Sequence, residues 1–193
     1  MGKENAFTPD WFEGNTPPRS YRSLFKWHDP EVFKHPNRGF YNLIRDTFGL
    51  SDKDFQNPDL DLCEFDMEAA TGMAAEILQK LMGICGEKNV STDTYERTRV
   101  SYGQGMIDIL RLREQIIENI CDAVVYPSSR EEIVEMILLC KDRQIPLTVF
   151  GGGSTVTRGI EAVKGGIILD MSRHMNKVLA FSETDQTITV QPG

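Results

Sequence analysis

Apolar residues change their spacing along the chain, and the change divides it into two parts. Over 1–120 they recur at helical intervals, among many aromatic and turn residues. Over 121–193, short β-branched runs alternate with one helical segment. The pattern predicts an α+β protein, in which a helical, aromatic-rich N-terminal region is followed by a second domain that contains a βαβ unit and ends in a β-hairpin.

Three helices are predicted in the first region. The stretch 40–48 has one apolar face and is followed by Gly49, a residue that commonly ends helices. Helical periodicity returns over 67–82. A further helix is expected to begin near Ser101 and to continue to Ile117.

The second region predicts strands at 123–126, 147–150 and 166–170, each short, apolar and rich in β-branched residues. Between the first two strands lies a helical segment with Ser128 or Ser129 at the N-cap position. Strand, helix and strand within this length indicate a parallel sheet with a right-handed crossover. The inward face of the helix is expected to comprise Ile133, Val134, Ile137 and Leu138, together with Cys140 or the stem of Lys141.

Two short strands, 177–181 and 187–191, flank the polar run 183–186 near the end of the sequence. This arrangement predicts a β-hairpin. Because a domain seldom ends on a hairpin with unpaired edges, we expect the chain to be a truncated part of a longer protein.

Charge and composition exclude several classes of protein. The formal net charge of −8 argues against nucleic-acid binding, which needs clustered Lys and Arg. The N-terminus lacks the apolar core of a signal peptide, and no apolar run approaches membrane-spanning length. The protein is therefore expected to be soluble and cytoplasmic, without a transmembrane segment.

The cysteines do not predict a metal site. They are far apart, and no His stands at metal-ligand spacing from them. We expect all four thiols to be reduced and buried: Cys63, Cys85, Cys121 and Cys140.

A run of three glycines, Gly151, Gly152 and Gly153, directly follows the strand 147–150. Successive amide groups in such a turn form a concave site for an anion such as phosphate. Ser154 and Thr155 would add hydroxyl donors. A plain glycine turn that binds no ligand would explain the same residues, and the glycine run alone does not distinguish the two interpretations.

Two better-known phosphate motifs are excluded. No Lys follows the glycines before Lys164, so the P-loop lacks its cation. The GxGxxG pattern of nicotinamide-dinucleotide domains is matched only loosely, and no acidic residue follows at the required position.

A family resemblance runs through the second region. The segments DAVVYPSSREEIVEMILLCKDRQIPLTVFGGGSTVTRGI, from Asp122, and GGIILDMSRHMNKVLAFSETDQTITVQPG, up to Gly193, resemble the start of a PCMH-type FAD-binding domain. This is the domain of FAD-linked oxidases of the vanillyl-alcohol oxidase class. The segment YERTRVSYGQGMIDILRLRE, from Tyr95, is similar to the stretch that precedes this domain in the alkyldihydroxyacetonephosphate synthase branch.

The resemblance implies where FAD would bind. In the family, backbone amides of the glycine loop hold the FAD pyrophosphate, and that role carries over to the run from Gly151 to Thr155. Relatives that bind flavin covalently through this loop have His where this chain has Ser154, so noncovalent FAD is implied. The family usually has Pro where Val149 stands, and it has the two hydroxyl residues in the opposite order. Four further residues would form the shell of the site: Val149, Phe150, Val156 and Gly159.

The same resemblance implies a FAD-dependent oxidoreductase or synthase-like enzyme. Its substrate would be a small molecule or a lipid precursor, and the full-length form would be a homodimer. The catalytic residues of the family lie beyond the point where this sequence ends, so none is assigned. Two alternatives remain: part of a flavin-dependent 2-hydroxy-acid dehydrogenase of the D-lactate or glycolate type, or a noncatalytic, vestigial nucleotide-binding module that binds a protein partner.

Other polar residues are interpreted as structural. His174 is expected in a turn after a strand, at the surface or as a capping residue. Arg111, Arg113 and Glu114 are expected to form a solvated helix face.

Overall fold

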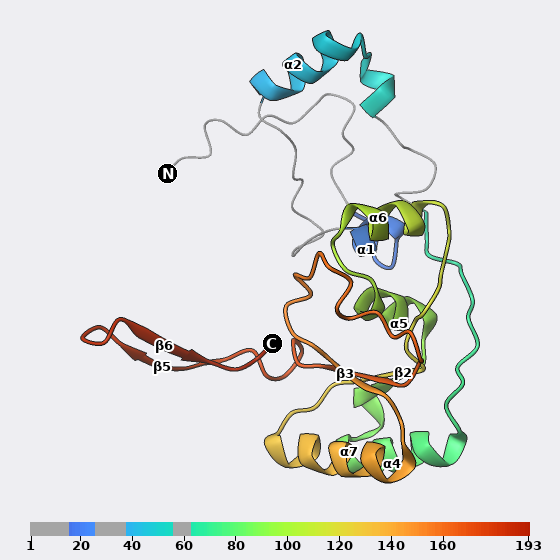
Figure 1. Ribbon diagram of the computed structural model, residues 1–193, viewed down its shortest axis with the longest axis vertical. Coiled ribbons are helices and arrows are strands. Elements are labelled where there is room, and N and C mark those ends of the chain that lie inside the picture. The colour runs from blue at the N-terminus through green and yellow to red at the C-terminus, as the bar shows by residue number, and fades with distance from the viewer. Residues whose placement is uncertain (1–15, 26–37, 56–62) are drawn as a thin grey trace. The chain divides into compact units, whose positions relative to one another are not determined.

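The structure is a computed structural model that describes residues 16–25, 38–55 and 63–193. The chain divides into two units, Met1–Phe65 and Asp66–Gly193, and each is described by itself (Figure 1). Residues 66–120 therefore pack in the same unit as residues 121–193.

The first unit contains helices α1 (Tyr21–Phe25) and α2 (Arg38–Phe48) and a 3-10 helix, η2 (Asp52–Phe55). Helix α2 confirms the helix predicted over 40–48. Gly49 has φ +64°, the left-handed conformation that ends helices and that glycine adopts without strain. The apolar face of α2 is largely exposed: Phe40, Leu43 and Phe48.

A four-stranded sheet organises the second unit, in the order β1-β2-β4-β3. Its strands are β1 (Val90–Ser91), β2 (Ala123–Val125), β3 (Leu147–Phe150) and β4 (Ile167–Asp170). The three predicted strands are confirmed, and β4 pairs in parallel with both β2 and β3. The short strand β1, which was not predicted, joins the sheet antiparallel to β2.

Helices cover both faces of this sheet, as Figure 1 shows. Helices α4 (Ala75–Cys85) and α7 (Arg130–Arg143) pack together on one face. Helix α5 (Thr94–Ser101) packs on the other face, against β2 and β4. Helix α6 (Met106–Arg113) follows α5 after a short turn.

The buried residues of β2 and β4 alternate between two cores, because successive side chains of a strand point to opposite faces. This explains why β2 and β4 are apolar throughout: parallel strands covered by helices on both faces have no solvent-exposed side. The core on the α4 and α7 side contains Ile77, Leu81, Cys85, Val125, Met136, Cys140, Ile167, Leu169 and Met171. The core on the α5 side contains Val100, Cys121, Val124, Tyr126, Phe150, Ile160, Ala162 and Ile168.

Two helix predictions in residues 66–120 need correction. The helix predicted over 67–82 begins only at Ala75, because the preceding backbone is extended and is held by Arg97, whose guanidinium donates to Ala69 O at 2.7 Å. The single helix predicted over 101–117 is wrong: α5 ends at Ser101 and α6 begins at Met106. The glycine-containing turn between them packs against a loop that is distant in sequence.

The start of α7 was predicted correctly, and its inward face was predicted in part. The Ser129 hydroxyl is the N-cap and accepts from the Glu132 amide at 3.2 Å. Met136 and Cys140, one turn apart, are the buried residues of the helix, and Ile133 and Leu139 pack against the same core. The inward face is therefore rotated from the predicted one: Ile133 and Cys140 lie on it, whereas Val134, Ile137 and Leu138 are exposed.

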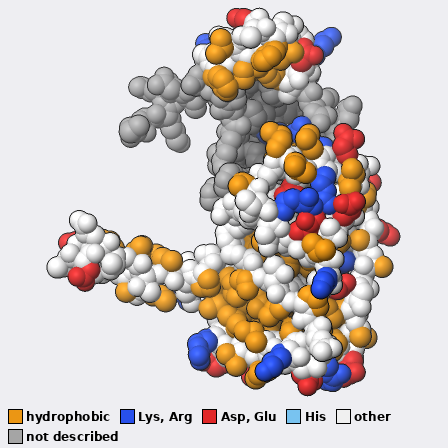
Figure 2. All heavy atoms as spheres, viewed as in Figure 1, with side chains coloured by type: hydrophobic (Ala, Val, Ile, Leu, Met, Phe, Trp, Pro, Cys, Tyr) orange, Lys and Arg blue, Asp and Glu red, His pale blue; other side chains and the backbone are white. Residues whose placement is uncertain are grey.

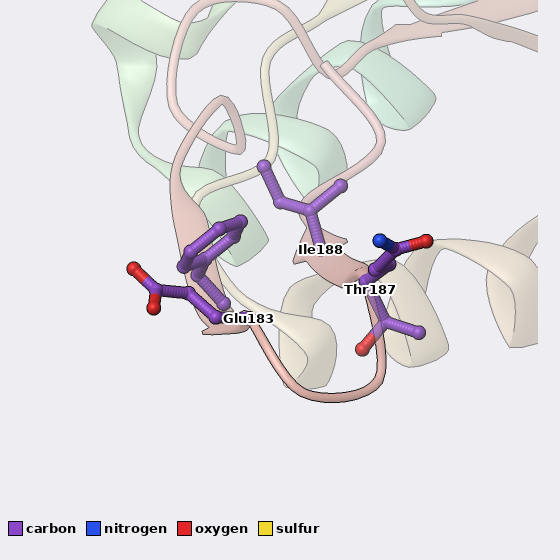
Figure 3. Close-up of a pocket in the computed structure, with 5 residues that line it drawn as sticks. Glu183, Thr187 and Ile188 are labelled. Atoms are coloured by element: carbon purple, nitrogen blue, oxygen red, sulfur yellow. The ribbon is translucent and has the colours of Figure 1, made fainter.

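The predicted hairpin is confirmed as strands β5 (Val178–Ser182) and β6 (Thr187–Val190), paired antiparallel in a sheet of their own. Figure 3 shows an open concavity on this hairpin. Among the side chains that line it, Glu183 is the one ionisable group. The concavity therefore lacks the converging polar groups of a catalytic site.

Three cysteines are buried and free, as predicted: Cys85, Cys121 and Cys140. Cys63 is also free, but its expected burial is wrong, since it is exposed in the first unit.

Candidate functional site

The glycine run follows β3 at the carboxyl ends of the parallel strands. In open parallel sheets this is the edge at which ligands bind. The loop from Gly151 to Gly159 has no regular secondary structure, and β4 returns the chain to the sheet beside β3. The sequence-predicted residues thus lie on one continuous loop at the expected edge.

The backbone amides of this loop are available to a ligand. None of the amide groups from Gly151 to Val156 donates a hydrogen bond to any residue that the structure describes. Gly152 and Ser154 are exposed, and Gly151, Gly153 and Thr155 are partly exposed. A row of unpaired, solvent-accessible amides is the arrangement that binds phosphate oxygens.

Two of the glycines are needed for steric reasons. Gly153 has φ +65°, and a Cβ atom built on it would lie 2.6 Å from the Phe150 ring. A Cβ atom on Gly151 would lie 2.6 Å from Pro192 O. Gly152 differs, since a Cβ atom there would meet no atom within 4 Å. A side chain at residue 152 would therefore extend into open space at the loop.

An ion pair between the partly buried Arg99 and the buried Asp170 lies beside the base of the loop. The Arg99 guanidinium lies 5.7 Å from the centre of the Phe150 ring and 2.5 Å from the Asp170 carboxylate at the end of β4. Asp170 is fully buried and also accepts the Ser172 hydroxyl at 2.6 Å. Burial alone would lower the pKa of Arg99, but the Asp170 and Glu96 carboxylates raise it above its ordinary value. Arg99 is thus a permanent cation beneath the loop.

The far side of the loop packs against the turn between α5 and α6. The Gln104 amide donates to Thr155 O at 2.9 Å. A Cβ atom on Gly103 would lie 2.8 Å from Thr155 O, and one on Gly105 would lie 3.1 Å from Val156 O. At residue 103 only glycine allows this close approach of two backbones, and at residue 105 a side chain would force a small shift.

The prediction of a solvated face on α6 is wrong for Arg111. Its side chain is 12% exposed, and its guanidinium lies 2.7 Å from Glu118 and 3.4 Å from Glu161. The guanidinium also stacks over the Tyr102 ring, 5.2 Å from the centroid. Arg113 and Glu114 are exposed, as expected.

The remaining candidate residue is His174. His174 is in the turn after β4, with Nε2 3.0 Å from the Asn89 amide oxygen. Among residues 16–25, 38–55 and 63–193, no three His, Cys, Asp or Glu side chains gather as a metal site would require. None of the described helices has the length and apolar character needed to cross a membrane.

Sequence reasoning identified the loop but missed the residues that support it. Gly103 and Gly105 carried a usable signal, because two closely spaced glycines interrupt a helical pattern and indicate close backbone approach. Arg99 and Asp170 carried no such signal, since 71 residues separate them and only the fold brings them together.

Comparisons with known proteins identify the same segment. Residues 121–193 match the family model described as FAD binding domain. Alkyldihydroxyacetonephosphate synthase from Dictyostelium discoideum is 27% identical over 173 residues, which cover 85% of this chain and 28% of that protein. Glycolate oxidase subunit GlcD from Bacillus subtilis (strain 168) is 35% identical over 72 residues, which cover 37% of this chain and 15% of that protein.

A solved structure supports the relationship. A structure of alkyldihydroxyacetonephosphate synthase aligns with a TM-score of 0.60 and 26% identity, over 65% of this chain and 26% of that chain. This chain therefore spans less than a third of each of these relatives. Residues 121–193 thus match the FAD binding domain family, which confirms the resemblance to FAD-linked oxidases that the sequence indicated.

Proposed function

We propose that this chain holds FAD noncovalently through the amides of Gly151 to Thr155, as the FAD-binding part of a flavin-dependent enzyme. The observation that carries the proposal is the row of amides without partners, on a loop inside the segment that matches the FAD binding domain. The FAD pyrophosphate carries the charge and the acceptor oxygens that such amides bind. Shell contacts are assigned to Val149, Phe150, Val156 and Gly159.

The residues of this chain bind and orient the cofactor, while bound flavin supplies redox chemistry. The loop amides fix the pyrophosphate. Arg99, paired with Asp170, contacts the Phe150 ring, and this ring packs closely against the backbone of Gly153. The noncovalent proposal rests on Ser154, whose hydroxyl is a weak nucleophile, in the position where relatives with a covalent link have His.

Among flavin enzymes, we propose a synthase-like protein of the alkyldihydroxyacetonephosphate synthase branch, acting in the cytoplasm on a lipid precursor, with a homodimeric full-length form. The similarity to the Dictyostelium synthase covers 85% of the chain and so includes much of the region before residue 121. A 2-hydroxy-acid dehydrogenase of the glycolate type is the second candidate. It is supported by the higher identity, 35%, of the shorter match to GlcD.

Titration with FAD tests the proposed site. Three forms of the 193-residue chain are compared by flavin fluorescence and calorimetry: the original chain, Gly152→Asp and Gly152→Asn. Because residue 152 faces open space, both side chains fit, and only Asp brings a negative charge to the amides. We expect saturable binding that is weakened at least tenfold by Asp, about 1.4 kcal/mol, and only slightly by Asn.

The alternatives give different results. Folded protein that binds no FAD would contradict cofactor binding by this chain. Binding that Gly152→Asp leaves unchanged would place the cofactor at another site.

A further inference from the structure

A cluster of charged residues, with a buried carboxylate at its centre, lies at the end of the glycine loop. At its centre is Asp108 of α6, which is 2% exposed. Its Oδ1 atom lies 3.5 Å from Arg158 Nε and 3.6 Å from Arg111 Nη1. Both guanidinium groups also pair with Glu161, so Asp108, Glu161 and the two arginines form one network of charges beside the loop.

The Asp108 carboxylate lies beneath the contact between the loop and the α5–α6 turn. A Cβ atom on Gly103 would lie 3.0 Å from Asp108 Oδ2 and 2.8 Å from Thr155 O. Both Asp108 Oδ2 and Arg158 Nε are buried without a hydrogen-bond partner among the described residues. Buried polar atoms are rarely left in this way, so the pair of atoms calls for an explanation.

Arg158 is held in an unusual backbone conformation. Its φ is +62°, a value that residues with a side chain seldom adopt. Its guanidinium also pairs with Glu161, and the Glu161 amide donates to Arg158 O at 3.1 Å. Glu161 in turn accepts from the Asn119 amide group at 2.8 Å. Although burial alone would raise the pKa of Glu161, the hydrogen bonds from Asn119 and Arg158 lower it, so Glu161 stays charged at neutral pH.

We propose that Asp108 and Arg158 are positioning residues that fix the C-terminal half of the loop, from Thr155 to Arg158, in the conformation that binds FAD. They act through the backbone and need not touch the cofactor. Helix α6, which lies outside the segment that matches the FAD binding domain, would then be part of the cofactor site. This inference rests on the proposed function of the glycine loop.

The test separates cofactor affinity from folding. FAD affinity and the urea midpoint are measured for Asp108→Asn, Arg158→Gln, their double variant and Arg158→Lys. Lys164→Gln is the matched control, because it removes an exposed positive charge from the same connection between β3 and β4. Arg158 is 37% exposed at its side chain, so Arg158→Gln leaves a folded protein for measurement even where Asp108→Asn does not.

We expect each of the two single variants to weaken FAD binding by roughly tenfold in folded protein, as the loss of one charged contact would. The double variant should be little weaker than either single one, because the two residues act as one unit. Arg158→Lys should restore part of the affinity, and Lys164→Gln should change it by less than about twofold. Folded variants that bind FAD as tightly as the original chain would overturn the proposal.

A second measurement distinguishes this proposal from the function on which it rests. Amide hydrogen exchange of Gln104 and Glu161, whose amides donate to Thr155 O and Arg158 O, is recorded without FAD. The proposal predicts faster exchange there in Arg158→Gln and unchanged exchange in Lys164→Gln. If the original chain binds no FAD, the proposed function fails, and the exchange result still decides whether Arg158 fixes the loop: unchanged exchange would contradict it.

Discussion

The central strands of the sheet and the two strands of the hairpin have similar sequences and opposite environments. Strands β2 (AVV) and β4 (IILD) are buried along their whole length. Strands β5 (VLAFS) and β6 (TITV) are equally rich in apolar and β-branched residues, yet almost all of their side chains are exposed. The difference shows that strand formation and strand burial have separate causes, since burial requires layers that cover the strand.

The hairpin has paired apolar residues, as a strand pair has when one of its faces packs against another element. The paired residues Val178 and Val190 are apolar and exposed, as are Phe181 and Ile188, whereas Ser182 pairs with Thr187. Figure 2 shows hydrophobic side chains along the hairpin. A two-stranded hairpin alone is marginally stable in water. The glycine loop extends from the four-stranded sheet, which has a core on each face. The hairpin, whose side chains are exposed, is expected to contribute little to the stability of this unit.

The largest effect is expected at the turn that leads into β4. Gly166 has φ +89°, and a Cβ atom there would lie 2.2 Å from Pro146 O. We expect Gly166→Ala to lower the free energy of unfolding by about 3 kcal/mol or more, because backbone strain and a steric clash act together. Urea unfolding followed by circular dichroism measures the change.

Gly83→Ala is the matched control for this prediction. Gly83 lies inside α4, where a Cβ atom would meet nothing within 4 Å, so alanine should stabilise the helix by up to about 1 kcal/mol. Equal effects of the two substitutions would show that the turn at Gly166 is not constrained as described.

A pair of identical substitutions tests the contrast between sheet and hairpin directly. Ile168 in β4 is fully buried, and Ile188 in β6 is 58% exposed. We expect Ile168→Ala to cost about 2–5 kcal/mol of unfolding free energy, through lost burial and a cavity. Ile188→Ala should cost less than about 1 kcal/mol. A large cost at Ile188 would mean that the hairpin face is buried in solution.

A smaller effect should appear as a dependence of stability on alkaline pH. Burial raises the pKa of Cys85 and of Cys121 from 9.0 to about 11. Between these values the thiols ionise in the unfolded chain but not in the folded one, so the unfolding free energy should fall as pH rises from 9 to 11. Urea midpoints at pH 8 and pH 10 measure this loss, and Cys121→Ala should reduce it.

The exposed thiol provides the comparison for the buried ones. Cys63 is exposed in the first unit, whereas Cys85, Cys121 and Cys140 are buried. One thiol per folded chain should react quickly with a disulfide reagent at pH 8, and Cys63→Ser should abolish this fast phase. Four fast thiols would contradict the burial of the other three.

Features with strong local causes could be predicted from the sequence. Ser129 caps a helix through its own hydroxyl. The apolar, β-branched runs at β2 and β4 form strands, the structure that such residues favour. The buried stripe of α7 depends on how the helix is rotated against the sheet. The sequence pattern left that rotation open, so Met136 was missed and Val134 was wrongly placed inside.

In the candidate site, too, the features with local causes could be predicted and those that depend on the tertiary fold could not. The glycine loop could be predicted because unusual backbone conformations require glycine, as the φ of Gly153 shows. Its supports could not, because Asp108 and Arg158 are 50 positions apart and their pairing depends on the tertiary fold. Charged residues on a helix usually face water, which is why Arg111 was misread as solvated.

Amide hydrogen exchange measured with and without FAD shows whether the loop amides bind the cofactor. Saturating FAD should slow exchange at Gly151 to Thr155, while the amides of the hairpin, 178–190, should exchange at unchanged rates. Saturable FAD binding that leaves exchange at Gly151 to Thr155 unchanged would mean that these amides do not hold FAD.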